Sequence, residues 1–267
     1  MSWWQAVLLG IVQGLTEFLP VSSSGHLTIG QSLLGVEFAE GDMLFFDVLV
    51  HAATVCSTLV ILWKEVWWLL RGTFGTAQWN DEKTYAGKIL LSMLPVMVVG
   101  LFFQDRLEQI FGNGLLIVGI CLLITALLLC FAHFAKPREK ATISWSDSFI
   151  IGLSQAVATL PGLSRSGTTI ATGLLLGNKR ETVAQFSFLM VLIPILGKTL
   201  LDTIDIAQGE ITTGLSAVAM ICGFVSAFVV GCAACKWMIS IVKRQKLLYF
   251  AIYCSLIGLF AIIYSLV

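Results

Sequence analysis

Six stretches of this 267-residue sequence are apolar over about the length that crosses a lipid bilayer. They cover residues 44–63, 89–103, 115–134, 183–201, 215–235 and 247–267. The composition agrees, since 57% of the residues are hydrophobic and 12% charged, compared with about 45–50% and about 25% in soluble domains. Because lipid cannot satisfy exposed backbone groups, such stretches are helical. The sequence therefore predicts an all-α polytopic membrane protein.

Two further apolar segments, residues 3–35 and 149–177, are interrupted in the middle and resemble each other. A shift of 142 positions aligns residues 9–35 with 151–177, with eight of 27 positions identical. The identities include an S-x-S-G frame at the interruption, residues 22–25 and 164–167. Each broken segment is followed by three unbroken stretches. We therefore expect one membrane domain, 1–267, made of a first repeat, 1–135, and a second repeat, 147–267.

The basic residues predict how the broken segments lie in the membrane. Each broken segment is longer than one crossing requires and shorter than two. If residues 149–177 enter and return, 13 loop Lys and Arg lie on one side and two on the other. If they cross once, the tally is 8 against 7 and the positive-inside bias vanishes. We expect six full spans and two re-entrant hairpins, in inverted-topology repeats, with both termini periplasmic.

The hairpin tips hold the chemistry, because non-helical backbone at membrane depth is tolerated where it lines a polar cavity. Pro20 and Pro161 are expected to end the first helix of each hairpin. The helix starts that follow offer amides and serine hydroxyls to an anion. The two copies differ in three aligned pairs: Glu17/Thr159, Ser23/Arg165 and His26/Thr168. The set predicts phosphate chemistry inside the membrane.

Arg165 is the most restrictive member of this set. An arginine within the membrane is costly unless it is paired or functional, and its planar fork suits phosphate oxygens. A purely structural pair with Glu17 is the alternative. His51 is interpreted as structural or cavity-lining, and Trp3, Trp4, Trp63, Trp67 and Trp68 as an aromatic belt.

Several other function classes are disfavoured. The net charge of zero argues against nucleic acid as a partner. The seven cysteines all lie in apolar stretches and are interpreted as buried hydrophobic residues. A secondary transporter or flippase of a lipid phosphate stays open, because such proteins share inverted repeats and broken helices. A transporter needs an anion site but no adjacent Ser, His and Glu, so the sequence favours an enzyme.

Two segments resemble the signature motifs of a known family. "QGLTEFLPVSSSGH", residues 13–26, is similar to (E/Q)xxxE with its serine-rich turn, and "LPGLSRSGTT", residues 160–169, is similar to PGxSRSxxT. Both motifs are signatures of the undecaprenyl pyrophosphate phosphatase family associated with bacitracin resistance, which this chain therefore resembles. The similarity covers essentially the whole chain. Gln13 stands at the first motif position, which is allowed but uncharged.

The resemblance implies hydrolysis of undecaprenyl pyrophosphate to undecaprenyl phosphate and inorganic phosphate. That reaction recycles the carrier lipid for peptidoglycan synthesis at the bacterial inner membrane, with a divalent cation, Mg²⁺ or Ca²⁺. The implied catalytic residues are Glu17, Ser23, His26 and Arg165, with Glu17 also the metal ligand. The expected substrate-binding residues are Gln13, Ser22, Ser24, Gly25, Ser164, Ser166, Gly167 and Thr168. The sequence leaves open whether Ser23, His26 or water attacks, and whether the protein is a homodimer.

Overall fold

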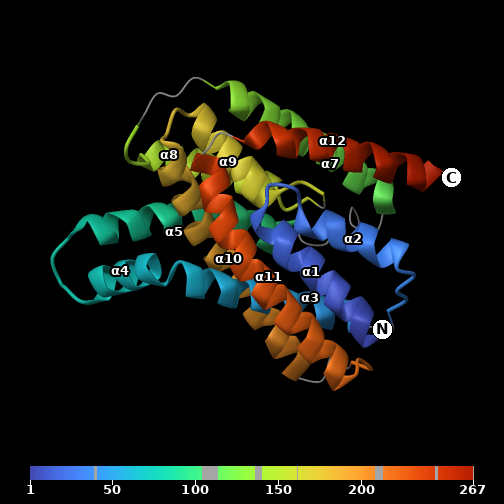
Figure 1. Ribbon diagram of the computed structural model, residues 1–267. Helices are drawn as coiled ribbons and strands as arrows, with labels where there is room; N and C mark the ends of the chain where they lie inside the picture. The colour runs from blue at the N-terminus through green and yellow to red at the C-terminus, as the bar shows by residue number, and fades with distance from the viewer. Residues whose placement is uncertain are drawn as a thin grey trace.

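The computed structural model describes residues 1–38, 41–103, 114–135, 140–160, 162–207, 213–243 and 246–266. Within these ranges the secondary structure consists of eleven helices and one isolated bridge, between Lys140 and Asn178. Figure 1 shows the helices gathered in one bundle, with the N-terminus and the C-terminal end of the described chain at the same end.

Six of the described helices are long and apolar enough to cross a membrane. They are α3 (Asp42–Ile61), α5 (Asp81–Phe102), α7 (Gly114–Phe134), α10 (Arg180–Ala207), α11 (Ala217–Lys243) and α12 (Leu247–Leu266). Each overlaps one of the six apolar stretches of the sequence. The prediction of an all-α protein with six long apolar helices is confirmed.

The two broken segments form helix hairpins. In the first, α1 (Trp3–Phe18) is followed by α2 (Ser23–Leu33), and Gln5 Nε2 donates to the Leu34 carbonyl at 3.2 Å. In the second, α8 (Trp145–Val157) is followed by α9 (Arg165–Leu175), and Asn178 Nδ2 donates to Asp147 Oδ2 at 3.1 Å. Both contacts join the start of one helix to the end of its partner. The hairpins open at opposite ends of the bundle (Figure 1).

The base of the second hairpin is fixed by a buried carboxylate. Asp147 accepts from Asn178 and pairs with Lys140 Nζ at 3.2 Å. Burial alone raises the pKa of Asp147, but the hydrogen bonds from Asn178 and Lys140 outweigh it and the pKa is lowered. The ionised form of Asp147 therefore stabilises the folded hairpin.

The repeated S-x-S-G frame makes the same helix cap in both hairpins. Ser22 Oγ accepts from the Gly25 amide at 3.4 Å, and Ser164 Oγ accepts from the Gly167 amide at 3.1 Å. Serine at this position satisfies an amide that has no partner within its own helix. In the first hairpin, α1 ends at Phe18, before Pro20; Pro161 lies outside the described residues.

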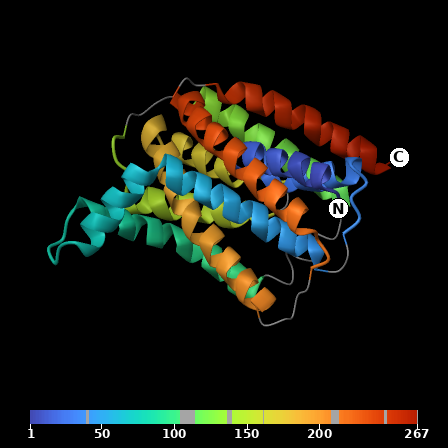
Figure 2. The ribbon, with the colours of Figure 1, turned by 60° about the horizontal axis from the view of Figure 1, so that its bottom comes forward.

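Each hairpin packs its first helix on a long helix of the other repeat: α1 on α11, and α8 on α5. A Cβ atom at Gly10 would lie 2.5 Å from the Gly223 carbonyl oxygen, and one at Gly152 would lie 2.2 Å from that of Ser92. Gly10 and Gly152 are aligned in the repeat, so the sequence repeat preserves one close helix crossing. The last helices of the two repeats, α7 and α12, also lie side by side (Figure 2).

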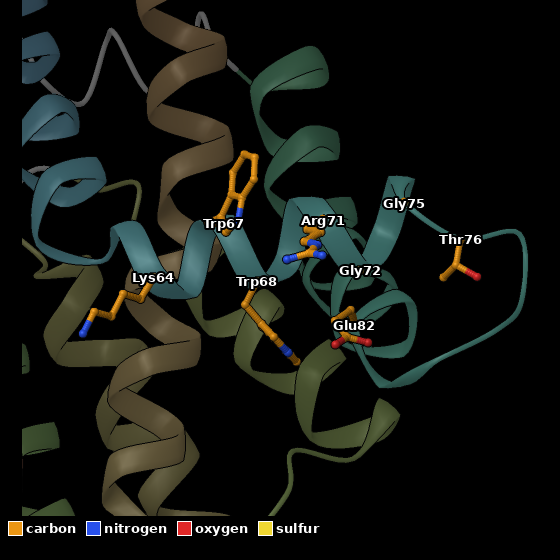
Figure 3. Close-up of a pocket in the computed structure, with 8 residues that line it drawn as sticks. All are labelled: Lys64, Trp67, Trp68, Arg71, Gly72, Gly75, Thr76 and Glu82. Carbon is orange, nitrogen blue, oxygen red and sulfur yellow. The ribbon is translucent and has the colours of Figure 1, made fainter.

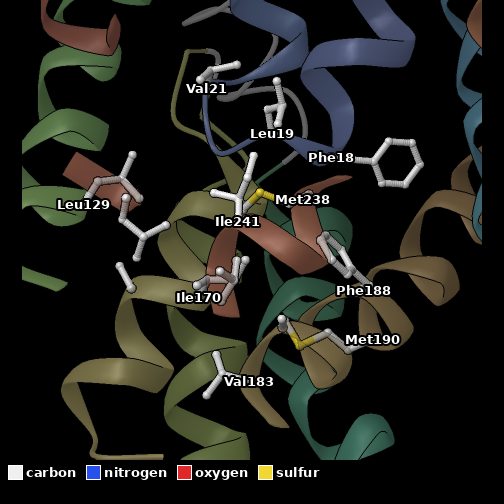
Figure 4. Packing of buried hydrophobic residues seen from close by; sticks show 14 of the residues in the cluster. Phe18, Leu19, Val21, Leu129, Ile170, Val183, Phe188, Met190, Met238 and Ile241 are labelled. Atoms are coloured by element: carbon white, nitrogen blue, oxygen red, sulfur yellow. The ribbon is translucent and has the colours of Figure 1, made fainter. Parts of the chain in front are cut away.

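One large apolar cluster joins the two repeats. Phe18, Leu19 and Val21 of the first hairpin belong to the same cluster as Ile170 of α9 and Met238 of α11 (Figure 4). All five residues are at most 6% exposed. Since the hairpin turns are embedded in shared core, their relative positions are set by packing as well as by polar contacts.

One helix was not predicted from the sequence. Helix α4 (Trp63–Phe74) begins directly after α3, where a span was expected to end. None of its residues is buried, and Trp63, Trp67 and Phe74 are exposed. An amphipathic helix with aromatic residues is typical of the lipid–water interface. Its Trp63, Trp67 and Trp68 match part of the expected aromatic belt, which stays a prediction.

Candidate active site

The turns of the two hairpins contact each other in the middle of the bundle. Ser166 Oγ donates to the Leu19 carbonyl at 3.2 Å, across 147 positions of sequence. Arg165, the first residue of α9, pairs through Nη2 with Glu17 Oε1 at 3.0 Å. These contacts bring Glu17 of the first motif and Arg165 of the second into one site.

Glu17 is the centre of this site. Its Oε2 accepts from Ser23 Oγ at 2.5 Å and from Gln13 Nε2 at 3.1 Å, while Oε1 accepts from Arg165. The Glu17 side chain is 7% exposed and that of Arg165 28%. A buried carboxylate is stable only when it is paired and hydrogen-bonded, so Glu17 holds Ser23 and Arg165 in place beside it.

Gln13 has one free oxygen in this arrangement. It lies one helical turn before Glu17 on α1 and is completely buried. Its Oε1 is a buried acceptor without a hydrogen-bond partner. Gln155, the aligned residue of the second repeat, is equally buried and also has an unpartnered Oε1. Only the copy at Gln13 faces a carboxylate, because Thr159 occupies the position of Glu17.

His51 lies beside Glu17, from a helix outside both motifs. Its Nε2 is 3.8 Å from Glu17 Oε2, and its Nδ1 bonds to the Asp47 carbonyl at 2.7 Å. The sequence interpretation of His51 as structural or cavity-lining did not include this contact. A signal existed: His51 is one of three histidines, on a span that directly follows the first hairpin.

His26 is oriented away from Ser23. Its Nδ1 bonds to the Ser22 carbonyl at 2.8 Å and its Nε2 to the Tyr253 hydroxyl at 2.9 Å. The hydroxyl of Ser23 points to Glu17, so the described contacts do not join His26 to Ser23 as the sequence suggested. Tyr253, on α12, has no motif signal. The structure therefore divides the first hairpin into a Glu17 side and a His26 side.

The remaining predicted binding residues line the same two turns. Ser22 and Ser24 hydroxyls are 3.4 Å apart, as are those of Ser164 and Ser166. Thr168 is buried and its Oγ1 has no hydrogen-bond partner. Ser22 and Ser164 accept helix-cap bonds from the Gly25 and Gly167 amides, and their role in substrate binding stays a prediction. Ser24 and Ser166 are the repeated hydroxyls without a capping bond of their own.

Ser22 also has unusual backbone geometry. Its φ of 70° is the only positive value for a described residue other than glycine. Left-handed backbone is unfavourable for a residue with a Cβ and is retained where surrounding structure enforces it. Here it directs the Ser22 carbonyl at His26.

A separate cavity of about 440 Å³ lies between α4 and α5 (Figure 3). Its lining consists of Lys64, Trp67, Trp68, Arg71, Gly72, Gly75, Thr76 and Glu82. None of these residues belongs to the hairpin turns. The cavity is therefore distinct from the site around Glu17.

Comparison with known proteins identifies the family of the chain. The family profile described as "Bacitracin resistance protein BacA" matches residues 6–260. The chain belongs to this family. Relatives of the BacA family named "Undecaprenyl-diphosphatase" include one from Parabacteroides distasonis, 60% identical over 98% of each chain, and one from Bacteroides thetaiotaomicron, 58% identical over 100% of each. A relative from Methanosphaera stadtmanae with the same name is 36% identical over 98% of each chain. The family resemblance found in the sequence is confirmed.

Proposed function

We propose that this BacA-family chain hydrolyses undecaprenyl diphosphate to undecaprenyl phosphate and inorganic phosphate. The observation that carries the proposal is the Glu17, Ser23 and Arg165 cluster, assembled where the two hairpin turns meet. The names of full-length relatives support hydrolysis over the transporter alternative. The activity returns the carrier lipid to cell-wall synthesis and accounts for the bacitracin resistance in the family's description.

Arg165 is assigned to the diphosphate. Its guanidinium uses Nη2 for Glu17 and is 28% exposed, which leaves the rest of the fork for phosphate oxygens. Such a cation in a water-poor site stabilises the charge that develops on a transferred phosphoryl group. Ser24 and Ser166 flank it with hydroxyl groups.

Ser23 is assigned as the nucleophile and Glu17 as its base. The hydrogen bond from Ser23 Oγ already directs the hydroxyl proton at Glu17 Oε2. Attack on the terminal phosphorus breaks its bond to the bridging oxygen, releases undecaprenyl phosphate and transfers the Ser23 proton to Glu17. Water then attacks the phosphoserine and gives a proton to His26. The bond between phosphorus and Ser23 Oγ breaks, Glu17 returns its proton to Oγ, and inorganic phosphate leaves.

A divalent cation fits the donor groups beside Glu17. Mg²⁺ is commonly held by one or two carboxylates together with substrate phosphates. Gln13 lies one helical turn before Glu17, and its unpartnered Oε1 becomes a second oxygen donor when the amide turns from its present bond, in which Nε2 faces Glu17. A cation bound by them would neutralise charge on the diphosphate. Although the described residues contain no cluster of three or more His, Cys, Asp and Glu, substrate oxygens can complete such a shell.

The hairpins are proposed to be re-entrant and the repeats inverted. Support comes from the hairpins opening at opposite ends, with both chain ends at one end of the bundle (Figure 1). The basic count supports termini in the periplasm of a bacterial inner-membrane protein, although Arg106, Lys136, Arg138 and Arg244 lie outside the described residues. Reporter fusions at the C-terminus should be active only in the periplasm. Activity in the cytoplasm would reverse this topology.

The function is tested with purified protein in detergent. The parent should convert undecaprenyl diphosphate to the monophosphate, and Ser23→Ala should abolish the reaction while Ser32→Ala, in the same helix, retains it. Rapid quenching of the parent should trap phosphate on Ser23. Turnover by Ser23→Ala at the parental rate would remove Ser23 as nucleophile. Mn²⁺ binding, followed by its electron paramagnetic resonance signal, should weaken in Gln13→Leu if Gln13 Oε1 is a ligand.

A further inference from the structure

Tyr253 reaches His26 from the opposite end of the sequence. Its hydroxyl lies 2.9 Å from His26 Nε2, across 227 positions. The two rings are stacked, with centroids 5.5 Å apart and planes inclined by 11°. The side chain contacts both the edge and the face of the imidazole, so it restricts both displacement and rotation of the ring.

The hydrogen bonds determine which nitrogen of His26 carries the proton. A backbone carbonyl can only accept, and the Ser22 carbonyl lies 2.8 Å from His26 Nδ1. Nδ1 is therefore the protonated nitrogen of neutral His26. Nε2 has a free lone pair and accepts from the Tyr253 hydroxyl. Because a phenol both donates and accepts, Tyr253 keeps this bond after Nε2 gains a proton.

The surrounding backbone holds this geometry in place. Ser22, whose carbonyl accepts from His26 Nδ1, has the left-handed backbone described above. On α12, the residue after Tyr253 also contacts the hairpin turn, since Cys254 Sγ lies 3.6 Å from the Pro20 carbonyl. Contacts to Pro20, in the turn, and to His26, after it, thus fix the position of α12 along the hairpin.

We propose that Tyr253 is a positioning residue for His26, fixing its Nδ1–H tautomer and the orientation of its ring. The inference rests on the proposed role of His26 in proton transfer. Nε2 is then the one basic nitrogen of the ring, and Tyr253 holds it ready to accept a proton. Tyr253 is 41% exposed, so its side chain has room to move away from Nε2 when substrate arrives.

Tyr253→Phe isolates the hydroxyl, since phenylalanine retains the ring that stacks on His26. Tyr249→Phe, one turn earlier on α12 and 69% exposed, is the matched control. We expect Tyr253→Phe to lower kcat by about 10-fold to 100-fold, as for other partners that orient an imidazole, with KM within about twofold. The control should retain parental kcat and KM.

The second readout is the rate at which diethyl pyrocarbonate modifies His26, measured by peptide mass spectrometry with His133 as internal reference. This reagent attacks an unprotonated ring nitrogen, and Tyr253 covers Nε2 in the parent. Tyr253→Phe should raise the modification rate of His26 at least threefold, and Tyr249→Phe should not.

An unchanged modification rate in Tyr253→Phe would disprove the contact. Faster modification with parental kcat would disprove the positioning role. The modification rate requires no turnover, so it separates failure of this inference from failure of the proposed function, which would be absence of phosphate release by the parent. Equal unfolding temperatures of the three proteins confirm that the comparison concerns folded protein.

Discussion

Replacing Glu17 by glutamine separates the charge of this residue from its shape. Three donors point at the carboxylate, from Arg165, Ser23 and Gln13. If the NH₂ group of the new glutamine took the place of Oε1, two donors would face each other, because Arg165 also donates there. The NH₂ group must therefore point at Ser23 and Gln13, and the amide oxygen at Arg165. Ser23 can reverse and accept, and Gln13 can turn its unpartnered Oε1 to the new donor. The fold therefore accommodates Glu17→Gln, but the Ser23 proton loses its acceptor.

The expected magnitudes follow from this rearrangement. Hydrogen bonds to a charged group contribute about 1.5–3 kcal/mol, and neutral ones about 0.5–1.5 kcal/mol. Three bonds that lose about 1 kcal/mol each lower the free energy of unfolding by about 3 kcal/mol. Loss of the base should lower turnover about 10²-fold to 10⁴-fold.

The assay is phosphate release from undecaprenyl diphosphate, with thermal unfolding in the same detergent. Glu37→Gln is the control, because Glu37 is exposed in the connection after α2. It should match the parent in both measurements. If Glu17→Gln retains more than half of the parental turnover, Glu17 is not the base.

Three further predictions concern other parts of the site and fold. Arg165→Lys keeps the charge but loses the fork, so it should lower kcat/KM about 10²-fold or more in the same assay. Gly152→Ala places a Cβ 2.2 Å from the Ser92 carbonyl oxygen and should lower the unfolding temperature, whereas Gly100→Ala, with open space, should not. Because the pKa of Asp147 is lowered from 3.8, Asp147→Asn should destabilise the protein at pH 7, and the difference from the parent in unfolding temperature should shrink only as the pH falls below 3.8 and through the lowered pKa.

The long helices were predictable because membrane solvation leaves a strong signal in the sequence. Span length and apolar content are enough to identify α7 or α12, which contain no Lys, Arg, Asp or Glu. The hairpin turns were predictable for another reason. The repeated S-x-S-G frame specifies the same serine cap twice, and the aligned Gly10 and Gly152 specify the same close crossing.

Contacts between distant segments were less accessible from the sequence. The sequence indicates a pairing of Arg165 with Glu17 as one alternative, because both stand out in apolar surroundings. The sequence gives no such signal for Tyr253, since an aromatic residue on an apolar helix resembles any lipid-facing residue until its partner is known. The position of His26 illustrates the same limit. Its nearness in sequence to Ser23 and Glu17 favoured one catalytic set, but the Ser22 carbonyl and the Tyr253 hydroxyl hold the imidazole toward α12.

Hydrolysis in water enriched in ¹⁸O tests most directly whether the site formed by the two hairpins cleaves the diphosphate by attack at its terminal phosphorus. The purified protein is incubated with undecaprenyl diphosphate, and both products are analysed by mass spectrometry. The account predicts that solvent oxygen enters the inorganic phosphate alone and that Ser23→Ala and Glu17→Gln produce little of it. Solvent oxygen in the undecaprenyl phosphate, or no release of phosphate by the parent, would contradict the account.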